Sequence, residues 1–257
     1  KRTWGYAAQL YSVASATSWG IGDLLDLADL ATWSATQQFA GFVLVNPLHA
    51  AQPLPPLEAS PYLPTSRRYV NPLYIRPEAV PEYAELDERS RSRIAQLKAK
   101  LAKELAGVEL IDRDRVWTAK IAALRVIFGH GLRAARQMAF NDFLRREGRG
   151  LTQFATWSAL VNECGGDWRE WPLELRRPSS PEVTAFAAEH TDEIEFYAWL
   201  QWIADDQLRA AQSAATDAGM RVGIMNDLAV GVGGHSAEAL AEIERAWNDG
   251  LHRAETA

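Results

Sequence analysis

Four consecutive apolar residues, Phe42 to Val45, constrain the fold of this chain more than any other feature. A glycine precedes them and Asn46-Pro47 follows, and a short apolar run with such boundaries is typical of a strand buried on both faces of a parallel sheet. A strand over residues 5–12 and a helix from Leu24 towards Gln38 are predicted before it, and Asp23 is placed to cap that helix. Strand, helix and strand within about forty residues predict a βαβ unit with parallel strands and a right-handed crossover.

The rest of the chain predicts a long helical region and one further strand. From Ser90 to about Glu189 apolar residues recur at helical spacing, with a break expected at residues 129–131. The first turns of a helix over 193–218 are apolar almost all round, so this helix is expected to be buried on more than one side. Residues 221–227 are predicted as a third strand, and Ser236 is placed to cap a last helix through Ile243 and Trp247.

These elements predict an α/β fold in three parts. Residues 1–89 would hold two βα units and a long loop, 90–189 a helical insertion, and 190–257 a third βα unit and a C-terminal helix. A complete (β/α)8 barrel needs eight strands, and the sequence provides three. The chain is therefore expected to be part of such a barrel, unless its strands pair in another way.

Composition narrows the classes of function. A net charge of -6 gives no electrostatic reason to expect nucleic acid or an anionic membrane as a partner. The single cysteine, Cys164, excludes an internal disulfide and fits a cytoplasmic protein. The five histidines show no metal-ligand spacing, and Gly20-Ile21-Gly22-Asp23 lacks the remaining residues of a nucleotide-binding loop. Neither a metal nor an organic cofactor is expected.

The stretch from Ser60 to Ile75 has neither a helical nor a strand period. Three prolines, two arginines and three tyrosines lie among its sixteen residues, and the residue before a proline avoids the helical conformation. Most of this backbone is therefore expected to be extended or turning. It belongs to a loop, residues 46–76, that leaves the carboxyl end of the second predicted strand, where parallel α/β folds bind ligands. This position favours a ligand site over a loop that only packs its tyrosines on its own domain.

Several motifs follow one another in the order of a known family. Together they resemble the bacterial 4-α-glucanotransferases called amylomaltases, of glycoside hydrolase family 77, from about Gly5 to Glu238. The motifs are Gln9-Leu10-Tyr11-Ser12, Ser18-Trp19-Gly20-Ile21-Gly22-Asp23, Asn46-Pro47-Leu48-His49-Ala50, the Ser60 to Ile75 stretch, Trp168-Arg169-Glu170-Trp171-Pro172-Leu173, and Asn226-Asp227-Leu228-Ala229-Val230-Gly231-Val232.

The resemblance implies retaining transfer of α-1,4-glucan segments between maltooligosaccharides. It implies that Asp227 hydrogen-bonds sugar hydroxyls near the cleavage subsite and is not the nucleophile. It also implies that Ser60 and Tyr62 contact the glucan. Asp227 ends a predicted strand, where an aspartate taken alone caps a loop about as often as it serves a site.

Three further residues are weaker candidates for substrate contact. The resemblance places Trp19 near the sugar site. His49 follows the second predicted strand, although a lone histidine there is more often a structural hydrogen-bonding group. Asn71 is a candidate as well, but with Pro72 it is expected chiefly to fix the loop backbone, because asparagine side chains readily satisfy turn amides.

No catalytic residue is assigned. Retaining transfer needs two carboxyl groups roughly 5 to 5.5 Å apart, and the family's nucleophile lies in an Arg-Ile-Asp-His-like run that this sequence lacks. The chain alone is expected to be inactive and to need the remainder of its catalytic domain as a partner. Residues 239–257 also depart from the family pattern. An inactive glucan-binding or assembly fragment, and a related α-glucan hydrolase, stay open as alternatives.

Overall fold

The computed structural model describes residues 2–241 and divides the chain into two compact units. Unit 1 consists of Lys1–Leu48, Val70–Asn141 and Trp199–Leu228, and unit 2 of His49–Tyr69, Asp142–Ala198 and the chain from Ala229 onward. Two of the divisions fall inside helices, one in α4 (Ala134–Cys164) and one in α6 (Thr191–Asp217). The expected insertion, 90–189, is therefore shared by both units rather than compact in itself.

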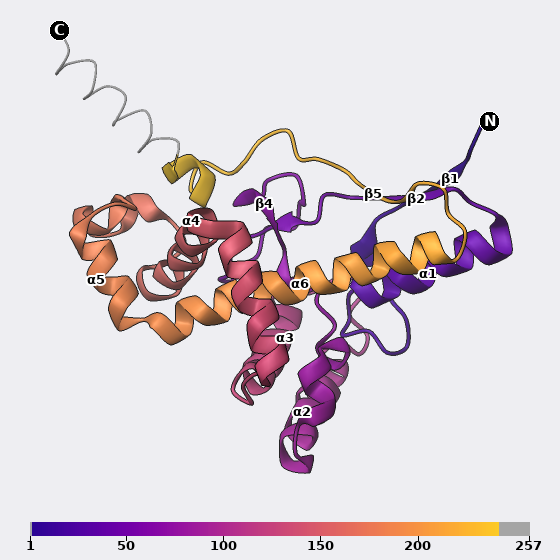
Figure 1. The fold of residues 1–257 in the computed structure, drawn as a ribbon, viewed down its shortest axis with the longest axis horizontal. Coiled ribbons are helices and arrows are strands. Elements are labelled where there is room, and N and C mark those ends of the chain that lie inside the picture. Colours follow the sequence, from indigo (N-terminus) through magenta and orange to yellow (C-terminus); the bar gives the residue numbers. More distant parts are fainter. Residues whose placement is uncertain (1, 242–257) are drawn as a thin grey trace, which may run out of the picture. The chain divides into compact units, whose positions relative to one another are not determined.

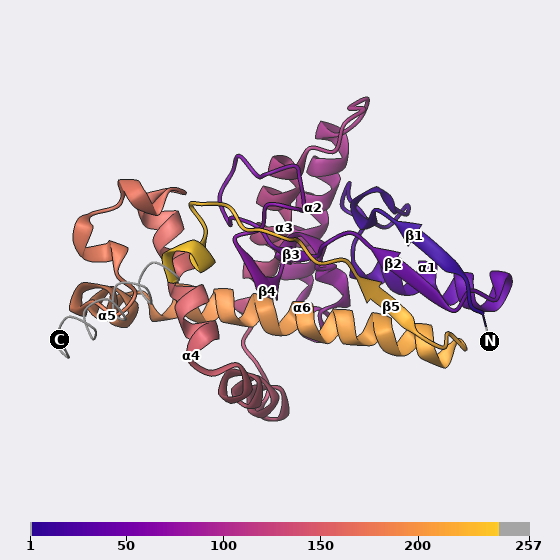
Figure 2. The ribbon, with the colours of Figure 1, turned by 90° about the horizontal axis from the view of Figure 1, so that it is seen from above.

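Unit 1 is built on a parallel sheet of three strands, seen side by side in Figures 1 and 2. β1 (Gly5–Ala8) and β5 (Gly223–Asn226) pair with the two edges of β2 (Phe42–Val45). The predicted parallel pairing of the first two strands is confirmed, and the third predicted strand joins the same sheet. β5 ends at Asn226, so the side chain that follows it lies at the carboxyl edge.

The first strand is shorter than predicted. β1 ends at Ala8, and Leu10–Ser12 form a 3-10 turn, η1, instead of continuing the expected strand to Ser12. The backbone N–H of Leu10 donates to Oδ1 of Asn46 at 2.7 Å. This buried hydrogen bond to a residue just beyond β2 replaces a ladder bond and lets the chain turn.

One face of the sheet is covered by α1 (Leu24–Gln38) and by the C-terminal half of α6. Val43 and Val45 lie in this core with alanines and leucines of both helices. Phe42 and Leu44, on the opposite face, are only half-buried. The strand was expected to be buried on both faces, and it is fully buried on one face only. The reason is that both helices pack on the same side.

The start and end of α1 follow from local side chains. Asp23 accepts hydrogen bonds from the amides of Leu25 and Asp26, and Asp26 bonds back to the amide of Asp23, which confirms the predicted cap as a capping box. Phe39 follows the last residue of α1, and its left-handed backbone conformation, with a φ of 56°, ends the helix. Trp33, near the C-terminal end of this helix, is 47% exposed.

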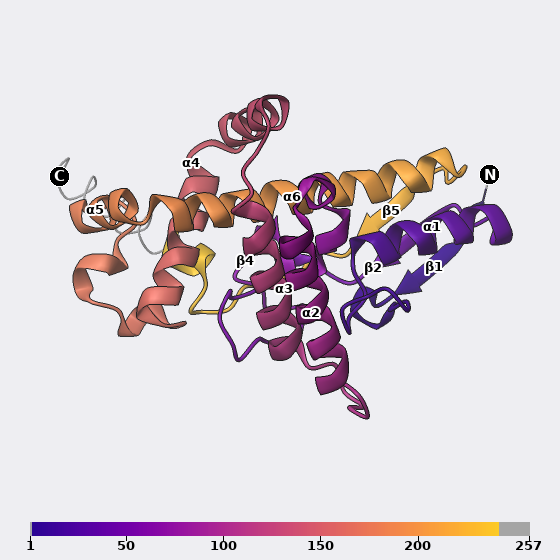
Figure 3. The ribbon, with the colours of Figure 1, turned by 90° about the horizontal axis from the view of Figure 1, so that it is seen from below.

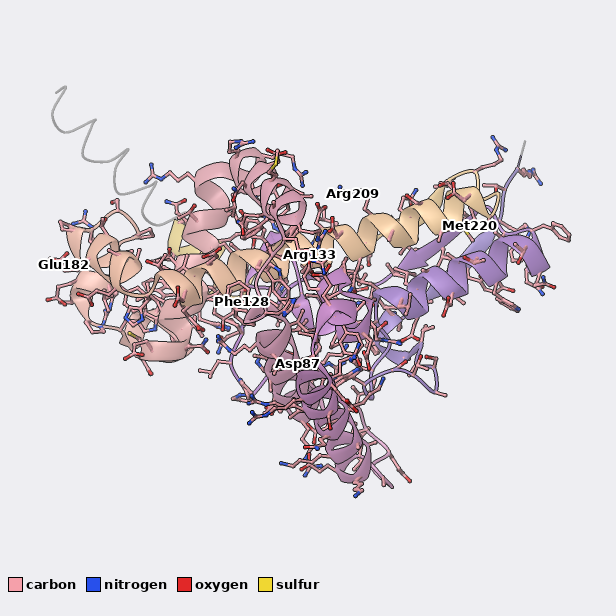
Figure 4. All side chains as sticks on the ribbon, turned by 60° about the horizontal axis from the view of Figure 1, so that its bottom comes forward. Asp87, Phe128, Arg133, Glu182, Arg209 and Met220 are labelled. Carbon is pink, nitrogen blue, oxygen red and sulfur yellow. The ribbon has the colours of Figure 1, made fainter. Side chains whose placement is uncertain are left out.

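The helical part of the chain begins with a pair of neighbouring helices in unit 1, α2 (Glu88–Glu104) and α3 (Arg113–Phe128) (Figure 3). Asp87 caps α2 by accepting from the amide of Ser90 at 2.6 Å (Figure 4). The predicted break at 129–131 is confirmed, because α4 begins only at Ala134. α4 is itself interrupted at Gly148, whose φ is 61°.

The other elements complete the helical region. α5 spans Pro181–Glu189, and residues 196–204 of α6 are all buried, which confirms the burial predicted for its first turns. Short 3-10 turns are η2 (Pro72–Tyr74), η3 (Pro77–Ala79), η4 (Pro81–Glu85), η5 (Trp168–Glu170) and η6 (Leu173–Arg176).

The loop 46–76 contains a second small sheet that its sequence did not indicate. β3 (His49–Ala50) pairs with β4 (Ser66–Val70), and the amide of Thr65 donates to the carbonyl of Ala50 at 2.8 Å. β4 has no strand period because its two arginines are consecutive and both exposed. Its conformation comes from pairing with a distant segment, which a local pattern does not report.

The chain leaves the described region in a helix. Residues 237–241 are helical, and Ser236 caps them by accepting from the amide of Ala239 at 3.0 Å, as predicted. The expected continuation of this helix to Ile243 and Trp247 lies outside the described residues.

Candidate functional site

Asp227 stands at the carboxyl edge of the three-stranded sheet. Its amide donates to the carbonyl of Val45 at 2.9 Å, which extends the pairing of β5 with β2 by one residue. Its Oδ1 accepts from the amide of Leu228 at 2.8 Å, and the residue is half-buried. The sheet therefore brings a carboxylate to the edge where parallel α/β folds bind ligands.

Two of the three residues after Asp227 are exposed. Leu228 is 64% exposed and Val230 is 93% exposed, whereas Ala229 between them is fully buried. Only one of these three side chains therefore packs against the protein. Two apolar side chains are left on the surface beside the carboxylate.

Trp19 is enclosed within unit 1. It is 1% exposed, and its Nε1 donates to the carboxylate of Glu78 at 2.9 Å. Nζ of Lys98 lies 5.5 Å from the centroid of its ring. The indole consequently presents no free face on which a sugar could stack, and its contacts are those of a structural residue.

Asn71 forms hydrogen bonds with backbone groups, as predicted from its position before Pro72. Its Oδ1 accepts from the amide of Leu73 at 3.0 Å and so caps η2. Its own amide donates to the carbonyl of Leu48 at 2.8 Å. These two bonds fix the end of the loop 46–76 beside the chain that leaves β2.

The three other candidates belong to unit 2. His49 is half-buried on β3, whereas Ser60 and Tyr62 are exposed in the loop. Oγ of Ser60 accepts from the amide of Tyr62 at 3.3 Å, and the amide of Ser60 donates to Oε1 of Glu58 at 2.9 Å. Tyr62 is 45% exposed, so a ligand can reach its ring. The structure thus brings Ser60 and Tyr62 together, while Trp19, Asn71 and Asp227 lie in unit 1.

A buried charge cluster in unit 1 was not predicted. Arg76 is 2% exposed, and its guanidinium forms ion pairs with Asp23, which is fully buried, and with Asp26, at 3.0 Å from Oδ1. It also donates to Oγ1 of Thr17 at 2.9 Å. Burial lowers the pKa of Arg76, but the hydrogen bond and charge of Asp23 outweigh it and raise that pKa above its ordinary value.

Lys120 of α3 completes the centre of this charge cluster. Its side chain is fully buried, and Nζ donates to the carbonyl of Leu73 at 2.7 Å and lies 3.8 Å from Oδ2 of Asp23. Burial lowers the pKa of Lys120 to about 8, against the opposing attraction of Asp23. Lys120 therefore bonds the backbone of η2 to the charged group at the start of α1.

Glu78 and Lys98 form the outer part of the cluster. Nζ of Lys98 lies 2.6 Å from Oε1 of Glu78 and donates to the carbonyl of Thr17 at 2.6 Å. Burial pushes the pKa of Glu78 upward, but hydrogen bonds from Lys98 and Trp19 outweigh it and hold that pKa below its ordinary value. The carboxylates of Asp23, Asp26 and Glu78 thus face three cations, which is how buried charge is tolerated.

One sequence signal could have found part of this cluster. Lys120 occupies the apolar stripe of its helix, four residues after Val116 and four before Leu124, both of which are fully buried. A lysine at such a position must either extend to solvent or find a buried partner. Its partners, at Leu73 and Asp23, are far away in the sequence and gave no local sign.

Unit 2 contains a cavity of about 720 Å³ beside β4 and the second half of α4. The ring of Tyr69 stacks on that of Phe154 with centroids 4.4 Å apart, and both residues line the cavity. Burial raises the pKa of Tyr69 to about 12. Arg68 and Glu238 contribute charge at its rim.

Among residues 2–241, no three histidine, cysteine, aspartate or glutamate side chains gather in a way that could hold a metal ion. Within the same part of the chain, no helix is long and apolar enough to span a membrane.

Known proteins match this arrangement of sheet, loop and helices. The model of the 4-alpha-glucanotransferase family, glycoside hydrolase family 77, matches residues 8–247. A 4-alpha-glucanotransferase of Mycobacterium bovis is 51% identical over 247 residues, 94% of this chain and 34% of that protein. One of Haemophilus influenzae is 34% identical over 271 residues, 97% of this chain and 37% of the relative.

Two solved structures are also similar. A crystal structure of an amylomaltase from Corynebacterium glutamicum has a TM-score of 0.78 at 43% identity, over 92% of this chain and 32% of that one. An amylomaltase from Streptococcus agalactiae, solved with acarbose, has a TM-score of 0.74 at 16% identity over 93% of this chain and 46% of that one, which shows likeness of fold alone.

The chain belongs to the 4-alpha-glucanotransferase family, glycoside hydrolase family 77. It spans about a third of the length of the relatives named above. The match extends to residue 247, so the expectation that the family pattern stops at Glu238 is wrong for the following nine residues. These nine residues contain none of the short motifs on which the resemblance to the family rests.

Proposed function

We propose that the protein containing this chain is a 4-α-glucanotransferase of the amylomaltase type, which moves α-1,4-glucan segments between maltooligosaccharides. The observation that carries this proposal is the placement of Asp227. Its carboxylate stands at the carboxyl edge of a parallel sheet, in a family whose members bear the name of this activity.

The exposed residues suit the chemistry of a sugar chain. A carboxylate accepts hydrogen bonds from the paired hydroxyls of a glucose unit, and charge-assisted bonds are roughly twice as strong as neutral ones. The half-exposed ring of Tyr62 can stack on the apolar face of a sugar, while Ser60 offers a hydroxyl two residues away. His49 and Asn71 are then supports of the loop that carries both, rather than groups in direct contact.

The three-stranded sheet is, in this proposal, an arc of a (β/α)8 barrel. Its strands are parallel, consecutive strands are neighbours, and α1 covers the outer face between the first two. A barrel arc places the end of every strand at one rim, where catalytic loops gather. The nucleophile and the acid/base would come from strands that this sequence does not contain.

The direct test uses the chain itself and maltoheptaose. Isothermal titration should detect binding, and Tyr62→Ala should weaken it about fivefold, since a stacked aromatic contributes roughly 1 kcal/mol. Trp33→Ala is the control, because Trp33 has nearly the same exposure, 47%, on α1. Equal losses in both variants, or no binding by the unmodified chain, would refute the proposal.

Activity is tested in the full-length protein with maltotriose. Asp227→Asn keeps the shape of the side chain and removes its charge, so the transfer rate should fall on the order of tenfold to a thousandfold. The affinity for maltotriose should fall much less. A normal rate with a lowered melting temperature would show that Asp227 only caps the turn after β5.

The alternative of a glucan-binding fragment rests on the missing nucleophile motif. Under both proposals the chain alone would bind maltoheptaose but form no glucose or longer oligomers from maltotriose. The two differ in the full-length protein, where chromatography should detect transfer products from maltotriose only if that protein is a 4-α-glucanotransferase.

A further inference from the structure

Three glutamines on α6 form hydrogen bonds to backbone N–H and C=O groups through their side-chain amides. A primary amide has one acceptor and a donor on the same planar group, so it can pair with the N–H and C=O of a backbone segment as a neighbouring strand would. The three residues are Gln201, Gln207 and Gln212, all within unit 1.

Gln201 pairs with both polar groups of a single residue. Its Oε1 accepts from the amide of Val70 at 2.9 Å, and its Nε2 donates to the carbonyl of Val70 at 2.9 Å. Gln201 is 4% exposed, so these bonds form out of contact with water. Losing either would leave a buried polar group unsatisfied.

Gln207 repeats this arrangement with Arg76, six residues further along both α6 and the segment it pairs with. Its Oε1 accepts from the amide of Arg76 and its Nε2 donates to the carbonyl of Arg76, each at 2.9 Å. The two glutamines therefore hold the two ends of the segment 70–76, which we call the return arm of the loop. Gln212 instead holds β5, by accepting from the amide of Ile224 at 2.7 Å and donating to the carbonyl of Val222 at 3.3 Å.

Between the two glutamines the return arm is fixed from other helices. Lys120 of α3 donates to the carbonyl of Leu73, and the side chain of Arg76 enters the charge cluster at the start of α1. Asn71 bonds the carbonyl of Leu48. The arm contains only the last residue of β4 and the short turn η2, yet it is attached to three helices and to the chain beyond β2.

We propose that Gln201 and Gln207 are positioning residues, which hold the return arm so that the loop 46–76 is ordered before a glucan arrives. This inference rests on the proposed function, because the loop carries Ser60 and Tyr62. A loop that is ordered in advance loses less conformational entropy on binding, and affinity is gained in this way without a new contact. Neither glutamine touches the sugar.

The test compares four variants of the chain by hydrogen exchange and by titration with maltoheptaose. Gln201→Met and Gln207→Met keep the length of the side chain but remove both bonds. Gln96→Met, on the exposed face of α2, is the matched control, and Gln212→Met separates the return arm from β5. Circular dichroism verifies that each variant is folded.

The expected result is selective. Gln201→Met and Gln207→Met should speed exchange at the amides of Val70 and Arg76 respectively, by tenfold or more. Each should weaken maltoheptaose binding about threefold to tenfold, while Gln96→Met changes neither quantity. Gln212→Met should speed exchange in β5 and leave the return arm unchanged.

A glutamate at position 201 adds a second measurement, the pH dependence of maltoheptaose affinity. This dependence would not change if Gln201 served only the stability of the fold. A protonated carboxyl can both donate and accept, so Gln201→Glu should bind maltoheptaose nearly as well as the unmodified chain at low pH. It should lose affinity as pH rises through the carboxyl's pKa, because the carboxylate cannot donate to the carbonyl of Val70. This variant also serves if Gln201→Met does not fold.

The outcomes separate the two proposals. If the unmodified chain does not bind maltoheptaose, the proposed function fails. If it binds, and Gln201→Met and Gln207→Met bind equally well or leave exchange in the return arm unchanged, the positioning role is refuted. A pH profile of Gln201→Glu that matches that of the unmodified chain would refute it as well.

Discussion

Replacing Lys120 by methionine tests the buried charge cluster directly. Methionine has nearly the same length and no charge, so Lys120→Met removes the cation without opening a large cavity. Two effects oppose each other: the fold loses the bond to the carbonyl of Leu73, and it no longer has to bury a charge. The stability difference between the unmodified chain and Lys120→Met at a single pH therefore cannot separate these two effects. Its dependence on pH can, because only the charge of Lys120 titrates.

The size of that dependence follows from the pKa of Lys120. Burial lowers it from 10.5 to about 8, against the opposing charge of Asp23. Between these two values the unfolded chain binds more protons than the folded one, so the stability contributed by this group rises with pH. Well below pH 8 the penalty for the buried charge is complete, at roughly 3 kcal/mol, and raising the pH from 7 to 9 should recover about 1 kcal/mol of it.

The assay is urea unfolding of the unmodified chain and of Lys120→Met at pH 7, 8 and 9. The unmodified chain should gain about 1 kcal/mol relative to the variant across this range. Subtracting the variant's values cancels the titration of other groups, since the neighbouring Asp23, Asp26, Arg76 and Glu78 are present in both. Lys100→Met, at an exposed lysine of α2, is the control and should show no such change.

A flat difference between pH 7 and 9 would refute this account. It would mean that Lys120 keeps an ordinary pKa and that its attraction to Asp23 offsets burial in full. A difference that falls with pH would be a stronger contradiction, because the ion pairs would then stabilise the charged amine.

Two other substitutions are predicted from contacts in the structure. Gly22→Ala should destabilise the chain by roughly 2 kcal/mol or more, because a Cβ there would overlap the backbone carbonyls of Leu10 and Val13. Gly231→Ala, with open space around it, should have little effect in the same urea-unfolding experiment. Tyr69→Phe should be nearly neutral at pH 7, since the hydroxyl of Tyr69 is buried and has no hydrogen-bond partner among the described residues. Because burial raises the pKa of this tyrosine to about 12, the unmodified chain should lose stability relative to Tyr69→Phe as pH rises from 10 to 12, and equal pH profiles would contradict this.

Local signals were sufficient for the βαβ unit. The cap at Asp23, the helical period that follows and the apolar run of β2 each depend on neighbours within a few residues, and the structure confirms all three. β4 and the early end of β1 were not predictable in this way. β4 depends on pairing with β3, and the turn after β1 on the hydrogen bond from Leu10 to Asn46, so each is set by residues far away in the sequence.

The candidate site shows the same division. A predicted strand end was enough to place Asp227 at the sheet edge. The irregular composition of residues 60–75 did not distinguish the exposed Tyr62 from the buried Tyr69 and Tyr74. The burial of Trp19 was not foreseeable, because its partner Glu78 lies 59 residues away. Charged partners leave no periodic pattern, so the charge cluster around Arg76 became visible only in three dimensions.

The order of the sheet has a consequence for synthesis. β5 pairs with β2 across roughly 180 residues of intervening chain, whereas β1 and β2 are close in sequence. At about 5 to 20 residues per second, a ribosome needs on the order of 10 to 35 seconds to make that interval. During this time one edge of β2 is open to other strands. Its length of four residues limits how firmly a wrong partner could bind. The nascent chain is thus most vulnerable to mispairing while the helices between β2 and β5 are being made.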